Sequence, residues 1–412
     1  MSDVTERFYR YIAVDTTSVD DAACYPSSEN QLVLAKKLER EMRELGLSDV
    51  RTDEYGYVTG TIPANRENVP VIGLIAHMDT SNAVSGANIQ ARTVLYEGGD
   101  IVLNRARSIR ISAQDAPELS RYVGQHLIVT DGTTLLGADD KAGIAEILTA
   151  AERLLTDSSI LHGEIRVCFT PDEEVGEGTK YFDVAAFGAD YAYTVDGEAL
   201  GELEYENFNA ATAKVVIHGK SMHPGASKGR MVNALMLAWE LQGMLPWQEQ
   251  PAYTEGYEGF FHLESMEGTV TEVSMRYLIR DHDRELFQKR KERMEKIAAY
   301  LNDKYGSGTV ELSVEDSYYN MKEKIAEHMD LVERAKDAFA ACGVAPKISP
   351  IRGGTDGAQL SYLGLPCPNL STGGHNCHSV VEFIPCESME TMVDVIIHLV
   401  SSFAGQTGDS DC

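Results

Sequence analysis

The chain has 412 residues, more than a single hydrophobic core usually supports, so two domains are expected. With 43% hydrophobic and 24% charged residues, the composition is that of an ordinary globular enzyme and gives no sign of disorder or of a fibrous repeat. The formal net charge of −28 argues against nucleic acid or an anionic membrane surface as a partner, because both require a positively charged surface.

The N-terminus and the cysteines bear on the location of the protein. Residues 1–7 lack a basic stretch followed by an apolar core, and no run reaches the roughly 18 apolar residues that a membrane span requires. The seven cysteines are odd in number and form no Cys-x-x-Cys pair, which fits reduced thiols and excludes a zinc site of paired thiolates. We therefore expect a cytoplasmic protein.

The first 62 residues predict a helix, a loop, a second helix and strands. Ser28 and Gln31 form a capping-box pattern ahead of an apolar helical stripe, and Gly46 ends that helix. Residues 53–62 predict a hairpin. We interpret this part of the chain as scaffold.

The apolar run 71–76 predicts a buried strand that leads into His77 and Asp79. Residues two apart in an extended segment lie on the same face, so Asp79 is able to orient the ring of His77, as an outer partner does for a metal-bound histidine. A histidine in this place is, by itself, more often a buried core residue. Residues 81–121 predict loop and short hairpins.

The heptapeptide Gly-Ala-Asp-Asp-Lys-Ala-Gly, residues 137–143, follows the apolar run 126–130 and opens a predicted helix at Ile144. Its aspartates therefore lie at a helix N-terminus, where Asp is a favoured cap and negative charge is stabilised. Capping alone would explain the motif. Asp139 becomes a candidate ligand only in company with other segments.

Three later strand-like runs also end in candidate ligands, which are Asp172, Glu173 and Glu174 after residues 164–169, Asp196 after residues 191–195, and His378 after residues 368–370. In an open α/β sheet, ligands bind outside the carboxyl ends of the strands, so these tips are expected to converge with His77 and Asp139. Imidazoles and several carboxylates in one crevice would be costly unless cations lay among them. The sequence therefore predicts a metal site.

The three adjacent acids at 172–174 have two interpretations. They fit a solvated helix start, which is the commoner occurrence of such a cluster. Beside a metal, however, adjacent glutamates can divide the work, with Glu174 as a ligand and Glu173 as the general base.

From about residue 208 the pattern changes to strands and helices in the order βαββαβ, which is typical of a ferredoxin-like unit inserted into another domain. We therefore predict three segments. Residues 1–207 form the first part of the catalytic domain, residues 208–319 form the inserted domain, and residues 320–412 complete the catalytic domain. The last residues, 405–412, predict a frayed tail.

Two further loops carry candidate residues. His223 precedes Pro-Gly in a long loop and is presented for contact, although an ordinary turn residue fits equally well. Ser227 completes a formal Gly-x-Ser-x-Gly, but it lies in a long loop instead of a tight strand-to-helix turn, which disfavours a serine nucleophile. Arg352, flanked by glycines, could bind a carboxylate through two hydrogen bonds or form a surface salt bridge.

The ordered set of motifs resembles the peptidase T family of aminotripeptidases, within the co-catalytic zinc aminoacylase and carboxypeptidase superfamily. The resemblance covers essentially the whole chain. It rests on His77-Met78-Asp79, Gly137-Ala138-Asp139-Asp140-Lys141, Pro171-Asp172-Glu173-Glu174-Val175-Gly176, Asp196, His223-Pro224-Gly225, Arg352-Gly353-Gly354-Thr355-Asp356-Gly357 and His378.

The resemblance implies an α/β fold, in which a mixed-sheet zinc-peptidase catalytic domain carries an inserted ferredoxin-like domain that serves as lid and dimerisation domain. It also implies two Zn²⁺ ions per chain, with Co²⁺ or Mn²⁺ as substitutes. Asp139 would bridge the two ions, and the other ligands would be His77 and Asp196 for one ion and Glu174 and His378 for the other.

The same resemblance implies roles for the remaining candidates. Asp79 would orient His77, and Glu173 would be the general base for a water that bridges the metals. His223 would reach the active site of the partner subunit and stabilise the oxyanion, while Arg352 would bind the carboxylate of the peptide. The implied protein is a cytoplasmic homodimer that releases the N-terminal residue of tripeptides.

One segment departs from the family pattern. Where the family has a tyrosine followed by His-Gly-Lys-His-Glu-Phe, this chain has His375 and then His378-Ser379-Val380-Val381-Glu382-Phe383. The ligand position is kept, but Val380 and Val381 replace a polar, basic pair, so substrate preference is open. The alternatives are a related dipeptidase or N-acyl amino acid hydrolase, a metal-binding protein without peptidase activity, and a serine hydrolase that uses Ser227.

Overall fold

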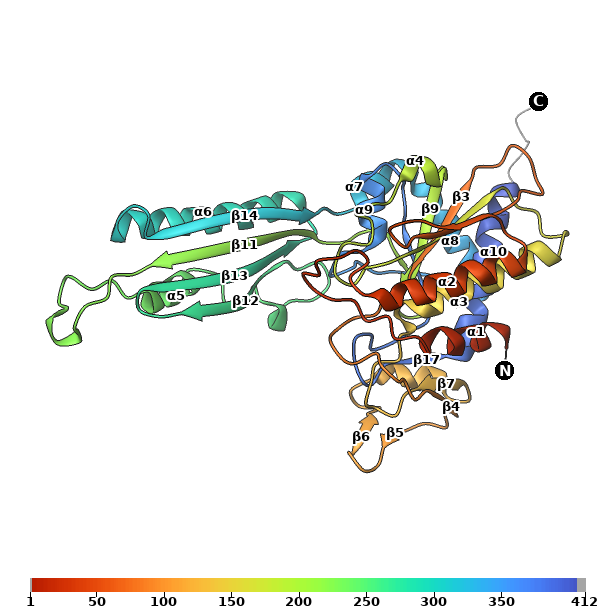
Figure 1. Ribbon diagram of the computed structural model, residues 1–412, viewed down its shortest axis with the longest axis horizontal. Coiled ribbons are helices and arrows are strands. Elements are labelled where there is room, and N and C mark those ends of the chain that lie inside the picture. Colours follow the sequence, from red (N-terminus) through yellow and green to blue (C-terminus); the bar gives the residue numbers. More distant parts are fainter. Residues whose placement is uncertain (1, 406–412) are drawn as a thin grey trace. The chain divides into compact units, whose positions relative to one another are not determined.

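The computed structural model describes residues 2–405 (Figure 1). The chain forms two compact units. The inserted unit comprises Glu206–Lys322 together with the short segment Pro350–Gly354, and the larger unit comprises the rest of the described chain. The segment expected to be a frayed tail lies, apart from Gly405, outside the described residues.

The larger unit is built on an eight-stranded mixed sheet. Its strands, in spatial order, are β1 (Ser48–Thr52), β2 (Val58–Ile62), β8 (Ile165–Thr170), β3 (Ile72–His77), β9 (Tyr191–Gly197), β16 (Asn369–Ser371), β10 (Glu202–Glu204) and β15 (Lys347–Ile348). The four strands β8, β3, β9 and β16 are mutually parallel, so their carboxyl ends meet at one edge. Each of these ends leads to a predicted ligand.

Helices cover both faces of this sheet. They are α1 (Asp3–Ile12), α2 (Glu29–Leu45), α3 (Ala138–Thr156), α4 (Val184–Phe187), α8 (Met329–Ala341), α9 (Asp356–Tyr362) and α10 (Cys386–Ala404). On one face of the sheet, Cys168 of β8 packs with residues of α4 and α9. The preceding residue of β8, Val167, pairs with Gly60 of β2, and Gly60 faces Met42 of α2. Neighbouring strand residues point to opposite faces, so α2 lies opposite α4 and α9.

The larger unit also contains a small three-stranded sheet that is separate from the main sheet. It has the order β17 (Phe383–Pro385), β7 (His126–Val129) and β4 (Arg92–Leu95), and a hairpin of β5 (Ile101–Asn104) and β6 (Ile109–Ile111) and the 3-10 helix η1 (Pro117–Tyr122) complete this region. Leu127, Val129 and Phe383 share one apolar core here. Asp139 is therefore not delivered by a strand of the main sheet.

The inserted unit has the predicted order βαββαβ. Its elements are β11 (Asn209–His218), α5 (Ala234–Gly243), β12 (Phe260–Gly268), β13 (Glu272–Asp281), α6 (Arg284–Tyr305) and β14 (Val310–Tyr318), together with the short 3-10 helices η2 (Pro224–Ala226) and η3 (Pro251–Tyr253). The antiparallel sheet has the order β12-β13-β11-β14. The ferredoxin-like arrangement expected from the sequence is confirmed.

The helix α5 buries only part of its apolar surface. Ala234, Leu237, Ala238 and Leu241 face the core of the inserted unit. The other large apolar residues of this helix are exposed, with exposed fractions of 41% for Leu235, 61% for Met236 and 72% for Trp239. Trp247, which follows the helix, is 62% exposed.

One local expectation was wrong. The Ser28 side chain makes no capping bond to a backbone N–H of α2, although the helix begins and ends as predicted and Gly46 closes it in the left-handed conformation. The short helix α7 (Lys322–Ile325) and the 3-10 turn η4 (Ala326–His328) precede α8.

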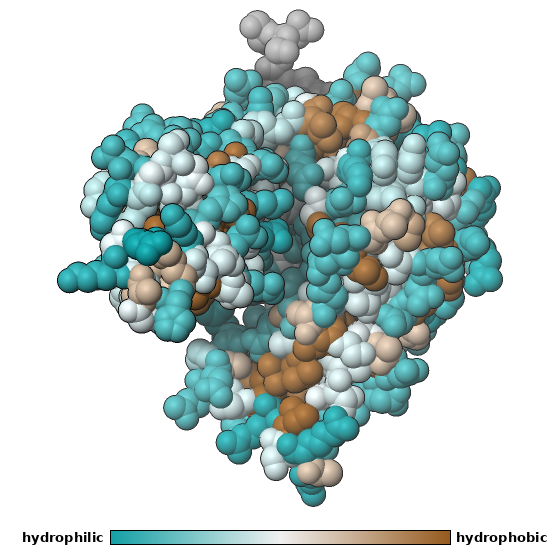
Figure 2. All heavy atoms as spheres, turned by 60° about the vertical axis from the view of Figure 1, so that its left-hand side comes forward, coloured by the Kyte–Doolittle hydropathy of each residue, from teal (hydrophilic) through white to brown (hydrophobic). Residues whose placement is uncertain are grey.

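Within the described chain, no helix is both long enough and apolar enough to cross a membrane. The face drawn in Figure 2 is largely hydrophilic, with separate small groups of hydrophobic residues, as the high content of acidic side chains leads one to expect.

Candidate metal centre

The first group of predicted ligands surrounds the imidazole of His77, which ends β3 and is 2% exposed. Its Nε2 lies 2.9 Å from Oδ1 of Asp139 and 3.2 Å from Oδ1 of Asp196. Burial disfavours the charged ring, but the negative charge of Asp196 and hydrogen bonds to Asp139 and Asp196 outweigh it, so the pKa of His77 is raised well above its usual value.

The second group surrounds His378, on the loop that follows β16. Its Nε2 lies 3.0 Å from Oδ2 of Asp139 and 2.9 Å from Oε2 of Glu174. Hydrogen bonds to these two carboxylates raise the pKa of His378 to about 11. Asp139 thus offers one carboxylate oxygen to each group.

The donor set fits a pair of divalent cations. In each group, three ligand atoms lie within 4.8 Å of one another. Each histidine Nε2 faces two carboxylate oxygens, and one N–H cannot donate well to both, whereas a cation attracts all three donors. Oε1 of Glu174 is buried and has no hydrogen-bond partner among the residues described. Imidazole and carboxylate ligands without thiolates are a common donor set for Zn²⁺.

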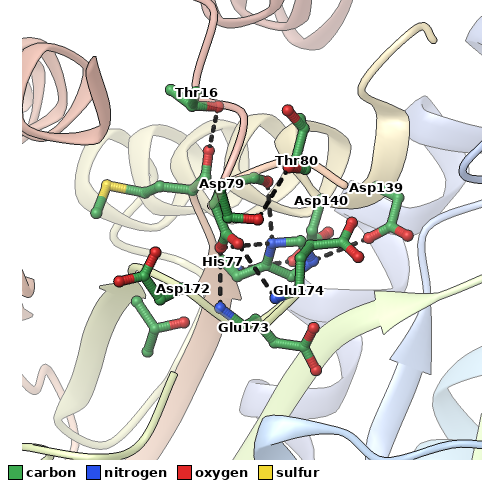
Figure 3. A network of polar contacts seen from close by, with 12 residues as sticks. Thr16, His77, Asp79, Thr80, Asp139, Asp140, Asp172, Glu173 and Glu174 are labelled. Carbon is green, nitrogen blue, oxygen red and sulfur yellow. Dashed lines mark hydrogen bonds and ion pairs between the residues drawn. The ribbon is translucent and has the colours of Figure 1, made fainter. Parts of the chain in front are cut away.

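Asp79 connects the two halves of this cluster, as Figure 3 shows. Its Oδ1 lies 3.4 Å from Nδ1 of His77 and accepts a hydrogen bond of 3.0 Å from the backbone N–H of Glu173, and its Oδ2 accepts one of 3.1 Å from that of Glu174. Asp79 is completely buried, where such bonds are stronger than in water. It therefore contacts a predicted ligand, the predicted base and a second ligand.

The tip that carries Glu173 and Glu174 is anchored through Asp172. This residue adopts a left-handed backbone with φ of +58°. Its carboxylate accepts hydrogen bonds from the Ser27 backbone N–H at 2.6 Å, from the Ser27 hydroxyl at 2.5 Å and from Nε2 of Gln31 at 2.7 Å. The strained tip is thus held by the segment that begins α2.

The carboxylate of Glu173 has no hydrogen bond or ion pair to another residue in the described chain. Figure 3 shows it extending away from Asp79. Burial, followed by the negative charge of Asp196, raises the pKa of Glu173 well above its usual value. Such a carboxylate is available to take a proton.

His223 and Arg352 both belong to the inserted unit. His223 is exposed at the start of η2. Arg352 is held within its own unit, where Nη1 donates to the carbonyl oxygens of Gly256 at 2.7 Å and Glu258 at 3.0 Å, and Nη2 donates to Oγ1 of Thr254 at 2.9 Å. Their roles toward substrate stay predictions.

The departure at His375 has a structural explanation. The ring is stacked on Phe383 with centroids 4.7 Å apart, and its Nε2 lies 2.7 Å from the hydroxyl of Tyr122. Val381 packs against the same apolar core. His375 is therefore part of the core of the small sheet, and the side-chain contacts described for it are to Tyr122 and Phe383.

Two supporting residues were not predicted. Asp140 accepts a hydrogen bond of 3.0 Å from the backbone N–H of His77 and one of 3.2 Å from that of Gly143. Glu382 binds the backbone of the loop that carries Asp139. Asp140 adjoins Asp139 in the motif, and Glu382 belongs to the Glu-Phe pair that this chain keeps from the family pattern. Neither signal indicates which backbone groups these carboxylates bind.

Comparison with known proteins decides the family. Residues 131–402 match the model of Peptidase family M20/M25/M40. The chain belongs to this family. The Peptidase T of Caldanaerobacter subterraneus subsp. tengcongensis is 53% identical to the chain over 98% of its length and 99% of the relative's length. The expected relationship to peptidase T and the metallopeptidase class are confirmed.

Solved structures agree in fold. A tripeptidase from Staphylococcus aureus superposes with a TM-score of 0.78 at 23% identity, covering 98% of both chains. A dinuclear metal-binding peptidase of the M20 family from Bacillus subtilis superposes with a TM-score of 0.64 at 15% identity, covering 97% of this chain and 98% of that one. At these identities the likeness shows the fold alone, and it confirms the predicted mixed-sheet domain with its insert.

The buried His375 generates a prediction about stability and pH. Burial, with a smaller effect of the charge on Arg121, lowers the pKa of His375 to about 4. The histidine of the unfolded chain has a pKa of about 6.5, so on acidification the unfolded chain takes up a proton before the folded chain does. The free energy of unfolding therefore decreases as the pH is lowered from about 6.5 to about 4. The contribution is fully present above about pH 6.5.

We expect His375→Gln to remove this component. The loss of unfolding free energy between pH 6.5 and pH 4 should be smaller in the variant, by about 1.4 kcal/mol per pH unit. Urea unfolding followed by circular dichroism, with a chelator present in all samples, measures the difference. Parallel pH profiles of the two proteins would contradict the prediction.

Proposed function

We propose that the chain is a two-metal aminopeptidase that removes the N-terminal residue of tripeptides, with Zn²⁺ as its metal. The observation that carries the proposal is the pair of ligand groups that share Asp139, beside a glutamate whose carboxylate is free of other bonds. The tripeptide preference rests on the relatives named Peptidase T, of which the cited one is 53% identical.

The chain's own residues divide the work as follows. His77 and Asp196 would hold one ion, Glu174 and His378 the other, and Asp139 both. When bound, two such cations acidify water and polarise the scissile carbonyl.

Glu173 is the proposed general base, because it can accept a proton from the attacking water at its carboxylate and return it to the leaving amine. Asp79 is proposed to hold the base and a ligand in place, since it binds the backbone N–H of Glu173 and orients the ring of His77. His223 is proposed to stabilise the oxyanion in the site of the partner subunit, and Arg352 to bind the carboxylate of the peptide.

The proposed assembly is a homodimer formed through the inserted unit, in the cytoplasm. Support for the dimer comes from α5, whose residues Leu235, Met236 and Trp239 expose a row of large apolar side chains. An exposed apolar helix face of this kind is costly in water unless another surface covers it.

The substitution Glu173→Gln tests the proposed base. The amide keeps the size of the side chain but cannot accept the proton, so kcat should fall by about 10²-fold to 10⁴-fold while two metal ions per chain remain bound. Metal analysis and steady-state kinetics with a tripeptide measure both. Glu177→Gln, at an exposed glutamate of the same loop, is the matched control and should keep wild-type kinetics. Wild-type turnover in Glu173→Gln would refute the assignment.

A substrate panel tests the preference for peptide length. Peptides of two, three and four residues and acylated amino acids should be compared by kcat/KM. We expect the tripeptides to give the highest values. A maximum for dipeptides or for acylated amino acids would instead identify a related hydrolase with the same metal centre, and a loaded protein that cleaves none of them would be a metal-binding protein without peptidase activity.

Mixed dimers test whether His223 and Arg352 serve one site from different subunits. His223→Ala and Arg352→Ala should each be nearly inactive as homodimers. After unfolding and refolding together, the mixture should regain part of the wild-type activity, because one site in each hybrid then has both residues. Loss of activity in each variant without any recovery in the mixture would argue against a site shared in this way.

A further inference from the structure

Glu382 lies at the end of the loop that runs from β16 of the main sheet to β17 of the small sheet. The loop is closed by two backbone hydrogen bonds between His375 and Phe383, of 2.9 and 3.1 Å. Between these ends it carries His378, with a left-handed φ of +61°, and Glu382, which is 1% exposed. One short loop therefore presents a predicted ligand outward and a carboxylate inward.

The Glu382 carboxylate binds the backbone of the loop that leads into α3. Its Oε2 accepts hydrogen bonds from the N–H groups of Leu136 at 2.6 Å and Gly137 at 3.0 Å, and its Oε1 accepts them from Ala138 at 2.7 Å and Asp139 at 3.4 Å. Four consecutive N–H groups thus share one carboxylate. Buried N–H groups left without acceptors would cost about 1–3 kcal/mol each, so this arrangement strongly favours one loop conformation.

The backbone at this point needs such support because it is irregular. Gly137 has a φ of +77°, and Asp139 and Asp140 have non-helical backbone angles although they fall within the bounds of α3. The helix itself therefore does not fix the direction of the Asp139 side chain. The last of the hydrogen bonds to Glu382 comes from the backbone N–H of Asp139, the residue whose carboxylate both ligand groups share.

Asp139 is thus held from two directions by the same loop. His378 contacts its side chain, with Nε2 3.0 Å from Oδ2, while Glu382 binds its backbone and that of the three preceding residues. A shift of this loop would move the second histidine and the shared aspartate together.

We propose that Glu382 is a positioning residue for the metal pair, which sets the Asp139 carboxylate between the two ligand groups and thereby sets the affinity for both ions. The inference rests on the proposed two-metal function. The Glu382 carboxylate binds backbone N–H groups and makes no hydrogen bond to a ligand side chain among the described residues. A substitution at Glu382 is nevertheless expected to lower the affinity of the protein for both ions together.

Metal affinity tests the inference directly. Glu382→Gln keeps the size of the side chain, but its amide nitrogen cannot accept hydrogen bonds, so two of the four N–H groups lose their acceptor. Competition of purified metal-free protein with a chromophoric chelator for Zn²⁺ should show affinities reduced about 10-fold to 100-fold at both sites, the range typical of outer partners of metal ligands. The visible absorption spectrum of the Co²⁺-loaded protein should change as well, because the shared carboxylate is displaced.

Glu387→Gln is the matched control. The Glu387 carboxylate also accepts a backbone N–H, that of His126, at 3.1 and 3.0 Å, but contacts neither the loop at residues 136–139 nor a predicted ligand. It should leave both affinities and the Co²⁺ spectrum as in the wild type. Glu382→Ala removes both acceptor oxygens and so leaves all four N–H groups without this partner. It should bind both ions more weakly than Glu382→Gln does, provided that circular dichroism shows it folded.

The outcomes separate this inference from the proposed function. A wild-type protein that does not bind two ions would refute the two-metal function itself. If the wild type binds two ions and Glu382→Gln binds them with the same affinities and the same Co²⁺ spectrum, the positioning role is refuted and the function stands. Loss of affinity at one site alone would also refute it, because the shared carboxylate would then not be what Glu382 controls.

Discussion

The site depends on one carboxylate that lies between two imidazoles. Asp139 faces His77 through Oδ1 and His378 through Oδ2, and these three residues come from the first, second and last thirds of the chain. Gathering several acids and two imidazoles in one place that is only partly open to water is costly, so the surrounding fold must hold them firmly. It does so with further carboxylates that bind backbone N–H groups, since Asp79, Asp172 and Glu382 each hold a segment that carries a ligand.

The sequence sufficed to predict the gathering of the ligands because a simple rule governs it. Parallel strands place their carboxyl ends at one edge, and the apolar runs that precede His77, Glu174, Asp196 and His378 are recognisable as strands from local pattern alone. The order βαββαβ of the insert was likewise readable from the periodicity of its segments. Both predictions use information that lies within about ten residues of each element.

What could not be predicted depends on partners that are far away in sequence. Ser28 and Gln31 look like a local capping box, but Gln31 Nε2 donates to Asp172, 141 residues away, at 2.7 Å and to the Ser28 hydroxyl at 3.2 Å. Glu382 acts on residues more than 240 positions earlier, and no spacing rule marks it. The run 126–130 is apolar whether it joins the large or the small sheet, so its pattern could not decide between them. His375 looked like a change in the site, and the structure makes it a core residue stacked on Phe383.

The position of the tryptophans has a practical consequence. The chain has only two, Trp239 and Trp247, and both are exposed in the inserted unit. Intrinsic indole emission is therefore a local probe, which is sensitive to whatever covers α5 and insensitive to loosening of the eight-stranded sheet. A single fluorescence melting curve would leave the larger unit unobserved, so that unit needs its own spectroscopic signal.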